Sequence, residues 1–272
     1  MSDGDGRTYR SNGVDLRVVV AGAGPDVLLV HGFPDDHSVW RRQIPALVAA
    51  GYRVIAPDTR GCGESAAPSG RRHYTLDLLV GDLIGLLDLL GVEKVRLVGH
   101  DWGAIIGWQL ALRHPERVDR FMALSVGHPT AYAHGSLEQK RKGWYVFFFM
   151  VPGVPEWLLR LGGWWVFRAV TGYDDEVAHW VARLTRPGRL TAAINYYRAN
   201  FRALLRTPYP PVRVPVMGVW SSGDRFLAEA QMIDTERYVD AAWRYERVEG
   251  VNHWLQLTAP ERVNALMLDF LR

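Results

Sequence analysis

A strand, a glycine-flanked turn and a helix follow one another near the middle of this 272-residue chain. The β-branched run Val95–Val98 leads into a Gly-His-Asp-Trp-Gly turn at 99–103, and Ala-Ile-Ile-Gly at 104–107 is a good start for a helix. A turn this sharp strains its central residue, and small residues must flank it where strand and helix approach closely. The segment therefore predicts a sharp elbow that presents Asp101 above the end of a strand.

The same alternation of strand and helix recurs along the chain. Short apolar runs that end in Gly, Pro or Asp favour buried parallel strands, and helical spacing of apolar residues separates them. This order predicts an α/β fold with a doubly wound, mostly parallel sheet and a ligand site at the carboxyl ends of its strands. We expect strands at Val27–Val30, Tyr52–Ala56, Val95–Val98, Phe121–Val126, Val214–Trp220 and Trp243–Val248, and helices at Thr75–Leu90 and Pro260–Leu271.

The pattern changes after Gly127, where about eighty residues are dominated by aromatic and helical segments. Strand-like periodicity returns only at Val214. We predict a core formed by residues 1–128 and 211–272, with residues 129–210 inserted as a helical cap.

Composition and charge exclude several classes of function. Hydrophobic residues make up 48% of the chain and charged residues 22%, which is enough apolar surface for a packed core. The formal charge of +3 comes from a small excess of basic residues, so it does not predict a nucleic-acid partner. Cys62 is the only cysteine, which excludes an intrachain disulfide and a cysteine metal cage. We expect no metal site.

Neither a secretory signal nor a membrane span is expected. Residues 1–13 lack a basic start followed by an apolar run. The most apolar stretch, Trp144–Leu161, is interrupted by Pro152, Pro155 and Glu156, so it is too short to cross a membrane. A cytoplasmic protein is the expectation.

The residue at the elbow indicates the chemistry. Asp101 stands where a serine esterase would have its serine, and a carboxylate suits attack on saturated carbon. Such an attack displaces an alkoxide or a halide and leaves an alkyl ester on the enzyme. The alternative is that Asp101 only caps the following helix, since Asp is a favoured N-cap residue. The residues at the other strand ends weigh against that alternative.

The loop after the first buried strand supplies a candidate oxyanion hole. His-Gly-Phe-Pro-Asp at 31–35 follows Val27–Val30, and the backbone N–H of Phe33 would pair with that of Trp102. Two such donors stabilise the charge that forms when water attacks an ester carbonyl. Pro34 has no N–H and can only shape the loop.

Two residues near the C-terminus complete a candidate triad. His253 follows the strand Trp243–Val248 and precedes the last helix, which favours it as the general base. Asp224 comes directly after the strand that ends at Trp220 and can orient the imidazole of His253. Asp240 is the alternative acid, but it falls within or beside a helix. The order nucleophile, acid, histidine is the one expected for α/β-hydrolases.

With these residues in place, nearly the whole chain resembles the epoxide hydrolase branch of the α/β-hydrolase family. The resemblance rests on His-Gly-Phe-Pro at 31–34, Asp-Thr-Arg-Gly-Cys-Gly-Glu-Ser at 58–65, Gly-His-Asp-Trp-Gly at 99–103 and His-Trp at 253–254. It implies two cap tyrosines that hold and protonate the epoxide oxygen. Tyr145 and Tyr197 match the local patterns, and Tyr196 competes with Tyr197 because helical neighbours point about 100° apart.

The resemblance implies a reaction without metal or organic cofactor. Asp101 would open a small apolar epoxide with help from Tyr145 and Tyr197, and water activated by His253 and Asp224 would hydrolyse the ester to a vicinal diol. Its partners would be the epoxide and water. For substrate binding we predict the aromatic residues Trp144, Phe148 and Trp254.

Two other functions stay open. Haloalkane dehalogenases resemble the chain in fold and in the Asp-Trp pair, and the indole N–H of Trp102 could hold a leaving halide. However, these enzymes usually have Asn or Glu at the position of Phe33, whose side chain offers no hydrogen-bond donor. Fluoroacetate dehalogenases keep Phe-Pro but have Arg at the position of Trp102. A noncatalytic binding protein is the second alternative, because fold alone does not establish function. The complete candidate triad argues against it.

Overall fold

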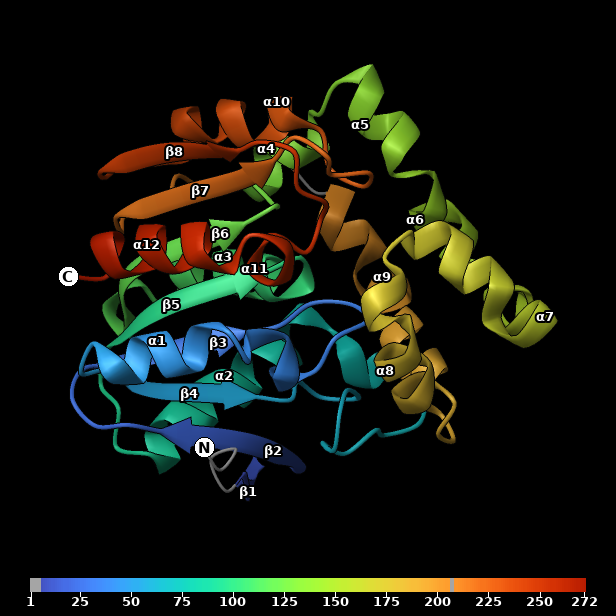
Figure 1. The fold of residues 1–272 in the computed structure, drawn as a ribbon, viewed down its shortest axis with the longest axis horizontal. Coiled ribbons are helices and arrows are strands. Elements are labelled where there is room, and N and C mark those ends of the chain that lie inside the picture. Colours follow the sequence, from blue (N-terminus) through green and yellow to red (C-terminus); the bar gives the residue numbers. More distant parts are fainter. Residues whose placement is uncertain (1–5, 206–207) are drawn as a thin grey trace.

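The computed structural model describes residues 6–205 and 208–272. Its centre is an eight-stranded sheet in the order β1-β2-β4-β3-β5-β6-β7-β8 (Figure 1). From β4 to β8 all neighbours are parallel, whereas β1 pairs with β2, and β2 with β4, in antiparallel fashion. This confirms the predicted doubly wound, mostly parallel sheet. The strands are β1 (Arg7–Ser11), β2 (Val14–Ala21), β3 (Asp26–Val30), β4 (Arg53–Pro57), β5 (Val95–His100), β6 (Val118–Leu124), β7 (Val216–Ser221) and β8 (Trp243–Val248).

All six predicted strands are present, as β3 to β8. Helices cover both faces of the sheet, so the side chains on both faces of a central strand are apolar. Every residue of Val27–Val30 and of β7 is buried. β1 and β2 were not predicted. β1 carries Arg7 and Arg10 on an exposed edge, so it lacks the apolar run by which the parallel strands are recognised.

Helices cover both faces of the sheet. Figure 1 shows α1, α11 and α12 in front of it and α2 and α3 behind it. The helix predicted at Thr75–Leu90 is α2, and Gly91 follows it with φ 67°, as expected of a left-handed C-cap. The core helices are α1 (Gln43–Ala49), α2 (Leu76–Leu89), α3 (Trp102–Arg113), α10 (Glu229–Ile233), α11 (Leu255–Thr258) and α12 (Pro260–Phe270), with 3₁₀ turns η1 (His37–Trp40), η2 (Arg71–Tyr74), η3 (Pro115–Arg117) and η4 (Asp234–Tyr238).

The segment between β6 and β7 is helical and lies beyond the carboxyl ends of the strands (Figure 1). Its helices are α4 (Pro129–Ala133), α5 (Leu137–Lys142), α6 (Trp144–Phe149), α7 (Val154–Thr171), α8 (Asp174–Leu184) and α9 (Arg189–Leu205). The stretch Trp144–Leu161 is broken between α6 and α7, and α7 itself loses helical backbone angles at Leu161–Trp164. Within residues 6–205 and 208–272, no helix is long and apolar enough to cross a membrane.

Candidate active site

Asp101 lies in a strained turn between β5 and α3. Its backbone has φ 51° and ψ −119°, a combination that L-residues rarely adopt. A Cβ on Gly99 would lie 2.4 Å from the carbonyl oxygen of Gly103, and one on Gly103 would lie 1.9 Å from that of Val30. Although Asp101 occupies the N-cap position of α3, its carboxylate makes no capping hydrogen bond. The elbow therefore holds this side chain for another purpose than helix capping.

The β3 loop contacts Asp101 directly. The backbone N–H of Phe33 donates to Asp101 Oδ1 at 2.7 Å. The approach is close because residue 32 is a glycine: a Cβ there would lie 2.4 Å from the Asp101 Cβ. Of the two predicted oxyanion donors, Phe33 thus contacts the Asp101 carboxylate through its backbone N–H. Trp102 is the first residue of α3 and follows Asp101 directly in the chain. The donor role of Trp102 stays a prediction.

His253 lies between two carboxylates. Its Nδ1 is 2.7 Å from Asp224 Oδ2, and its Nε2 is 3.7 Å from Asp101 Oδ2, too long for a direct hydrogen bond. The other oxygen of Asp224 accepts the backbone N–H groups of Phe226 and Leu227. The structure thus brings the three predicted residues together, each of them buried. The alternative acid, Asp240, is exposed and lies outside this group.

Charge explains how this group titrates. Burial alone would lower the pKa of His253, but Asp224 and Asp101 raise it to about 10. Burial would raise the pKa of Asp101, yet His253 and the N–H of Phe33 hold it below its ordinary value. At neutral pH an imidazolium ion therefore lies between two carboxylates. His100, whose pKa falls to about 3 through burial and the charge of His253, is neutral and donates to the His253 carbonyl at 2.9 Å.

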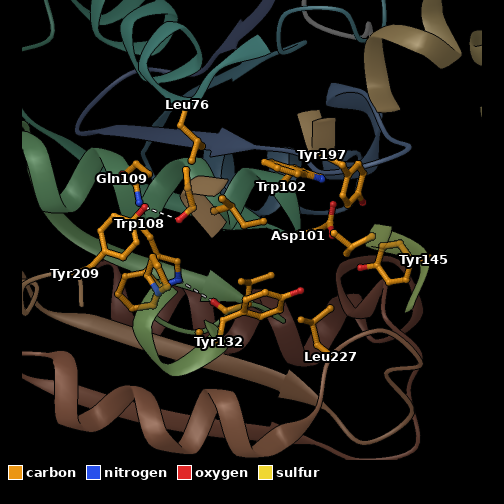
Figure 2. A pocket seen from close by; sticks show the side chains of 16 residues that line it. Leu76, Asp101, Trp102, Trp108, Gln109, Tyr132, Tyr145, Tyr197, Tyr209 and Leu227 are labelled. Atoms are coloured by element: carbon orange, nitrogen blue, oxygen red, sulfur yellow. Dashed lines mark hydrogen bonds between the residues drawn. The ribbon is translucent and has the colours of Figure 1, made fainter. Parts of the chain in front are cut away.

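Tyr145 and Tyr197 flank Asp101 (Figure 2). Their ring centroids are 5.9 Å apart, and burial raises the pKa of both phenols well above 10, so both keep their protons at neutral pH. Tyr196 points elsewhere: its hydroxyl donates to the carbonyl of Arg60 at 2.5 Å and lies 3.0 Å from Thr59 Oγ1. The structure therefore turns Tyr197, and not Tyr196, toward the nucleophile.

Two cavities meet at Asp101. Asp101, Tyr145 and Tyr197 line both of them. The larger, of about 620 Å³, extends along α3 to Trp108 and Gln109 (Figure 2). The smaller, of about 460 Å³, lies on the side of His253 and Trp254. Apart from these named residues, mainly apolar side chains line both spaces, including Leu76, Ile105, Val126, Val146 and Leu227 in the larger and Phe33, Phe149, Leu159, Phe167 and Phe226 in the smaller.

Two of the three predicted substrate-binding aromatics do not reach these cavities. Trp144 is 56% exposed and lines neither space, so its assignment is wrong. Phe148 packs between Trp144 and Phe149 and also lines neither. The helix α6 turns Val146 and Phe149 inward, and Phe149 takes the place that we assigned to Phe148. Trp254 lines the smaller cavity, and its role in substrate binding stays a prediction.

Sequence reasoning missed Tyr132 and Asp35. Tyr132 lies in α4 and lines the larger cavity, with its hydroxyl directed toward the cavity centre (Figure 2). Its place shortly after the end of β6 was a usable signal, because ligands bind where parallel strands end. Asp35 is buried, and its carboxyl accepts the indole N–H groups of Trp180 and Trp254 at 2.8 and 3.1 Å. Burial raises the pKa of Asp35 to about 8.

Helix α5 fixes the loop that carries the acid. Lys142 Nζ donates to the backbone carbonyls of Asp224 and Leu227 at 2.8 and 3.2 Å. The side chain of Gln139 accepts the N–H of Ala228 and donates to the carbonyl of Phe226. The position of Asp224 thus depends on a helix of the segment between β6 and β7.

One cluster of two carboxylates and a histidine has the donor types of a metal site. Ligand atoms of Asp36, His37 and Asp58 lie within 4.8 Å of one another. They already have partners: His37 Nδ1 is 2.6 Å from Asp58 Oδ1, and Asp36 Oδ2 is 3.1 Å from both His179 Nε2 and Arg183 Nε. Ion pairs with basic side chains explain this cluster without a metal.

Comparison with known proteins places these features in a family. The family model of the α/β hydrolase fold matches residues 25–163. The chain is 34% identical over 275 residues to the AB hydrolase superfamily protein YfhM of Bacillus subtilis, with 96% of each chain covered. It is 32% identical over 311 residues to Epoxide hydrolase A of Mycobacterium tuberculosis, covering 97% of this chain and 96% of the relative. The crystal structure of Epoxide Hydrolase A from Mycobacterium thermoresistibile superimposes with a TM-score of 0.87 at 32% identity, covering 98% of both chains.

Proposed function

Since the chain belongs to the α/β-hydrolase fold family, we propose that it is an epoxide hydrolase that works through a covalent ester on Asp101. One observation supports this most: a buried carboxylate at a strained elbow lies where two apolar cavities meet, with two phenols beside it and an imidazole within 3.7 Å. Relatives named epoxide hydrolases, at 32% identity over nearly the whole chain, agree with it.

In the first step Asp101 opens the epoxide ring. The N–H of Phe33 holds Oδ1, so Oδ2 is the oxygen that attacks a ring carbon. The carbon–oxygen bond of the ring breaks, and the electron pair goes to the ring oxygen. Tyr145 and Tyr197 donate hydrogen bonds to this developing alkoxide, and one of them supplies its proton. Both phenols are protonated at neutral pH because burial raises their pKa.

In the second step water hydrolyses the ester. Loss of the Asp101 charge lowers the pKa of His253, so the imidazolium gives up its proton, which replaces the one that a tyrosine gave to the alkoxide. The neutral Nε2 then takes a proton from water as the water attacks the ester carbonyl. The bond between the carbonyl carbon and the alkyl oxygen breaks, and that oxygen takes the remaining acid proton, which leaves Asp101 as a carboxylate. Asp224 holds the imidazole through Nδ1 and stabilises its charged form. The N–H of Phe33, with that of Trp102, stabilises the oxyanion, and the diol leaves.

The two cavities indicate the kind of substrate. An epoxide held at Asp101 can extend one apolar group along α3 and another toward Trp254. We therefore propose an apolar epoxide as substrate, with residues 129–210 acting as the cap that closes over it. Of these, 206 and 207 lie outside the described residues.

Haloalkane dehalogenation is a second candidate because of one atom. The indole Nε1 of Trp102 is buried and has no hydrogen bond of standard geometry within the described residues, and its polar neighbour is Tyr197, with which it interacts (Figure 2). A donor in this position could hold a leaving halide. Tyr145 and Tyr197 favour the epoxide, because a halide ion needs no proton.

A single-turnover reaction with excess enzyme and styrene oxide in ¹⁸O-labelled water tests the proposal. We expect diol with unlabelled oxygen and label in the peptide that contains Asp101. His253→Gln should accumulate enzyme that is heavier by one styrene oxide. Labelled oxygen in the first diol would instead mean direct attack by water. Absence of diol, with bromide released from bromoalkanes, would establish the dehalogenase.

A further inference from the structure

Helices α5 to α7 expose an unusual share of the large apolar side chains. Of the ten that are exposed in the described part of the chain, eight lie between residues 137 and 165. We call them the α5–α7 surface: Leu137, Trp144, Phe147, Val151, Val154, Trp157, Leu161 and Trp165. Single exposed apolar residues are ordinary, but a group of this size on adjoining helices marks an interaction site. Figure 1 shows α6 and α7 at the outer edge of the molecule.

The same helices are apolar on their inner sides as well. Leu159 and Phe167 of α7 are buried and line the smaller cavity, while Trp157 and Trp165 on the opposite side are 63% and 67% exposed. A surface helix normally presents polar residues to water, and a helix that is apolar all round is normally covered. The outer side of α7 therefore combines the tryptophans of a covered face with the exposed Arg160 and Arg168.

Basic side chains outnumber acidic ones along helices α5 to α7, and the exposed Asp174 and Asp175 begin α8 three residues after α7 ends. Residues 137–171 contain five basic and two acidic side chains. Both acids are paired, Glu138 with Lys142 at 3.0 Å and Glu156 with Arg198 at 2.6 Å. Lys140, Arg141 and Arg168 are exposed, and none of them forms an ion pair among the described residues. Exposed tryptophans next to basic side chains are the combination that binds the interface of an anionic membrane.

We propose that the α5–α7 surface docks the protein on an anionic lipid bilayer. Trp157 and Trp165 enter the headgroup region, and Lys140, Arg141 and Arg168 contact lipid phosphates. Lipid fits better than a second copy of the chain, because two copies would bring the same positive surplus face to face. Docking also places the smaller cavity about one helix diameter, roughly 10 Å, from a lipid phase in which apolar molecules dissolve.

Co-sedimentation with vesicles tests the proposal without requiring any turnover. We expect the protein to bind vesicles of phosphatidylcholine with phosphatidylglycerol more tightly than vesicles of phosphatidylcholine alone. The double variant Trp157→Ser, Trp165→Ser should lower the partition coefficient roughly tenfold or more. Lys140→Gln with Arg141→Gln should lower it roughly tenfold on the anionic vesicles only. Leu89→Ser is the matched control: Leu89 is 56% exposed, but it is the last residue of α2 and lies outside the α5–α7 surface, so replacing it should leave vesicle binding unchanged.

The outcomes separate the explanations. Failure of the wild-type protein to sediment with anionic vesicles overturns the proposal, as does equal binding by the tryptophan variant. A dimer in light scattering that becomes a monomer in the tryptophan variant, without vesicle binding, assigns the surface to a second copy instead. Thermal melting verifies that each variant folds, and Trp165→Ser alone repeats the test if the double variant does not.

Discussion

The proposed ester should change the pKa of His253, and this change can be calculated from the geometry. The Nε2 of His253 is 3.7 Å from Asp101 Oδ2. At an effective dielectric constant of about 20, a unit charge at about 4 Å contributes about 4 kcal/mol, or about three pKa units. Esterification of Asp101 removes that charge. The pKa of His253, about 10 in the free enzyme, should then fall to about 7 in the ester.

The sign of the pH dependence follows from the two steps. Activation of water needs neutral His253, so ester hydrolysis should accelerate as the pH rises through about 7 and level off above it. Ring opening needs charged Asp101, whose pKa is held below its ordinary value, so it should stay constant across the same range. Stopped-flow tryptophan fluorescence with excess enzyme separates the steps, since Trp102 and Trp254 lie next to the reacting groups.

Asp224→Asn is the control, because it removes the other charge beside His253 while keeping the shape of the side chain. In this variant the midpoint for hydrolysis should move further down and the plateau rate should drop. A hydrolysis rate that does not change with pH, or that follows a midpoint near 10, would refute the argument that the charge of Asp101 sets the pKa of His253.

Three further predictions concern single side chains. Tyr197→Phe should slow ring opening about 100-fold or more, because the alkoxide loses one oxyanion donor; single-turnover rates measure this. Tyr196→Phe should leave ring opening nearly unchanged and lower the free energy of unfolding by about 1 kcal/mol, which denaturant titration measures. Lys142→Met should destabilise the fold by about 2 kcal/mol, because two buried carbonyls lose a charged donor, and should slow ester hydrolysis more than ring opening. Gly103→Ala should prevent folding or lower the melting temperature by more than about 10 °C, since its Cβ would lie 1.9 Å from a backbone oxygen; normal expression and melting would contradict this.

The core of the molecule was predictable because its parts have local causes. The elbow needs small residues on both sides of Asp101, and parallel strands buried on both faces need continuous apolar runs. Asp224 and His253 could be chosen because each follows a strand, and strand ends meet at one edge of a parallel sheet. The family resemblance rests on the same residues, and the family comparison confirms it.

The inserted helices were less predictable because tertiary contacts decide which way their side chains point. Tyr196 and Tyr197 are equivalent in local sequence, and only the contact of Tyr196 with Thr59 and Arg60 distinguishes them. The errors at Trp144 and Phe148 have a related cause: α6 is short, and composition does not say which of its aromatics face inward.

Helix α9 has a further consequence for how this chain can vary. Arg189, Tyr196 and Asn200 are spaced by seven and four residues, so they share one side of the helix. Each bonds to the core loops: Arg189 to the carbonyl of Cys62, Tyr196 to that of Arg60, and Asn200 to Tyr74 and Leu76.

These three anchors fix the rotation of α9 about its own axis. One residue inserted between Arg189 and Tyr196 would turn the following part of the helix by about 100°. Tyr196 would then take the direction that Tyr197 has now, and Tyr197 would turn away from Asp101. We therefore expect insertions and deletions to be tolerated in the chain before Arg189. Between Arg189 and Asn200 we expect them not to be tolerated, because they would separate the three anchoring side chains. Because these bonds join α9 to the core, we expect any opening above Asp101 to involve the helices that precede α9.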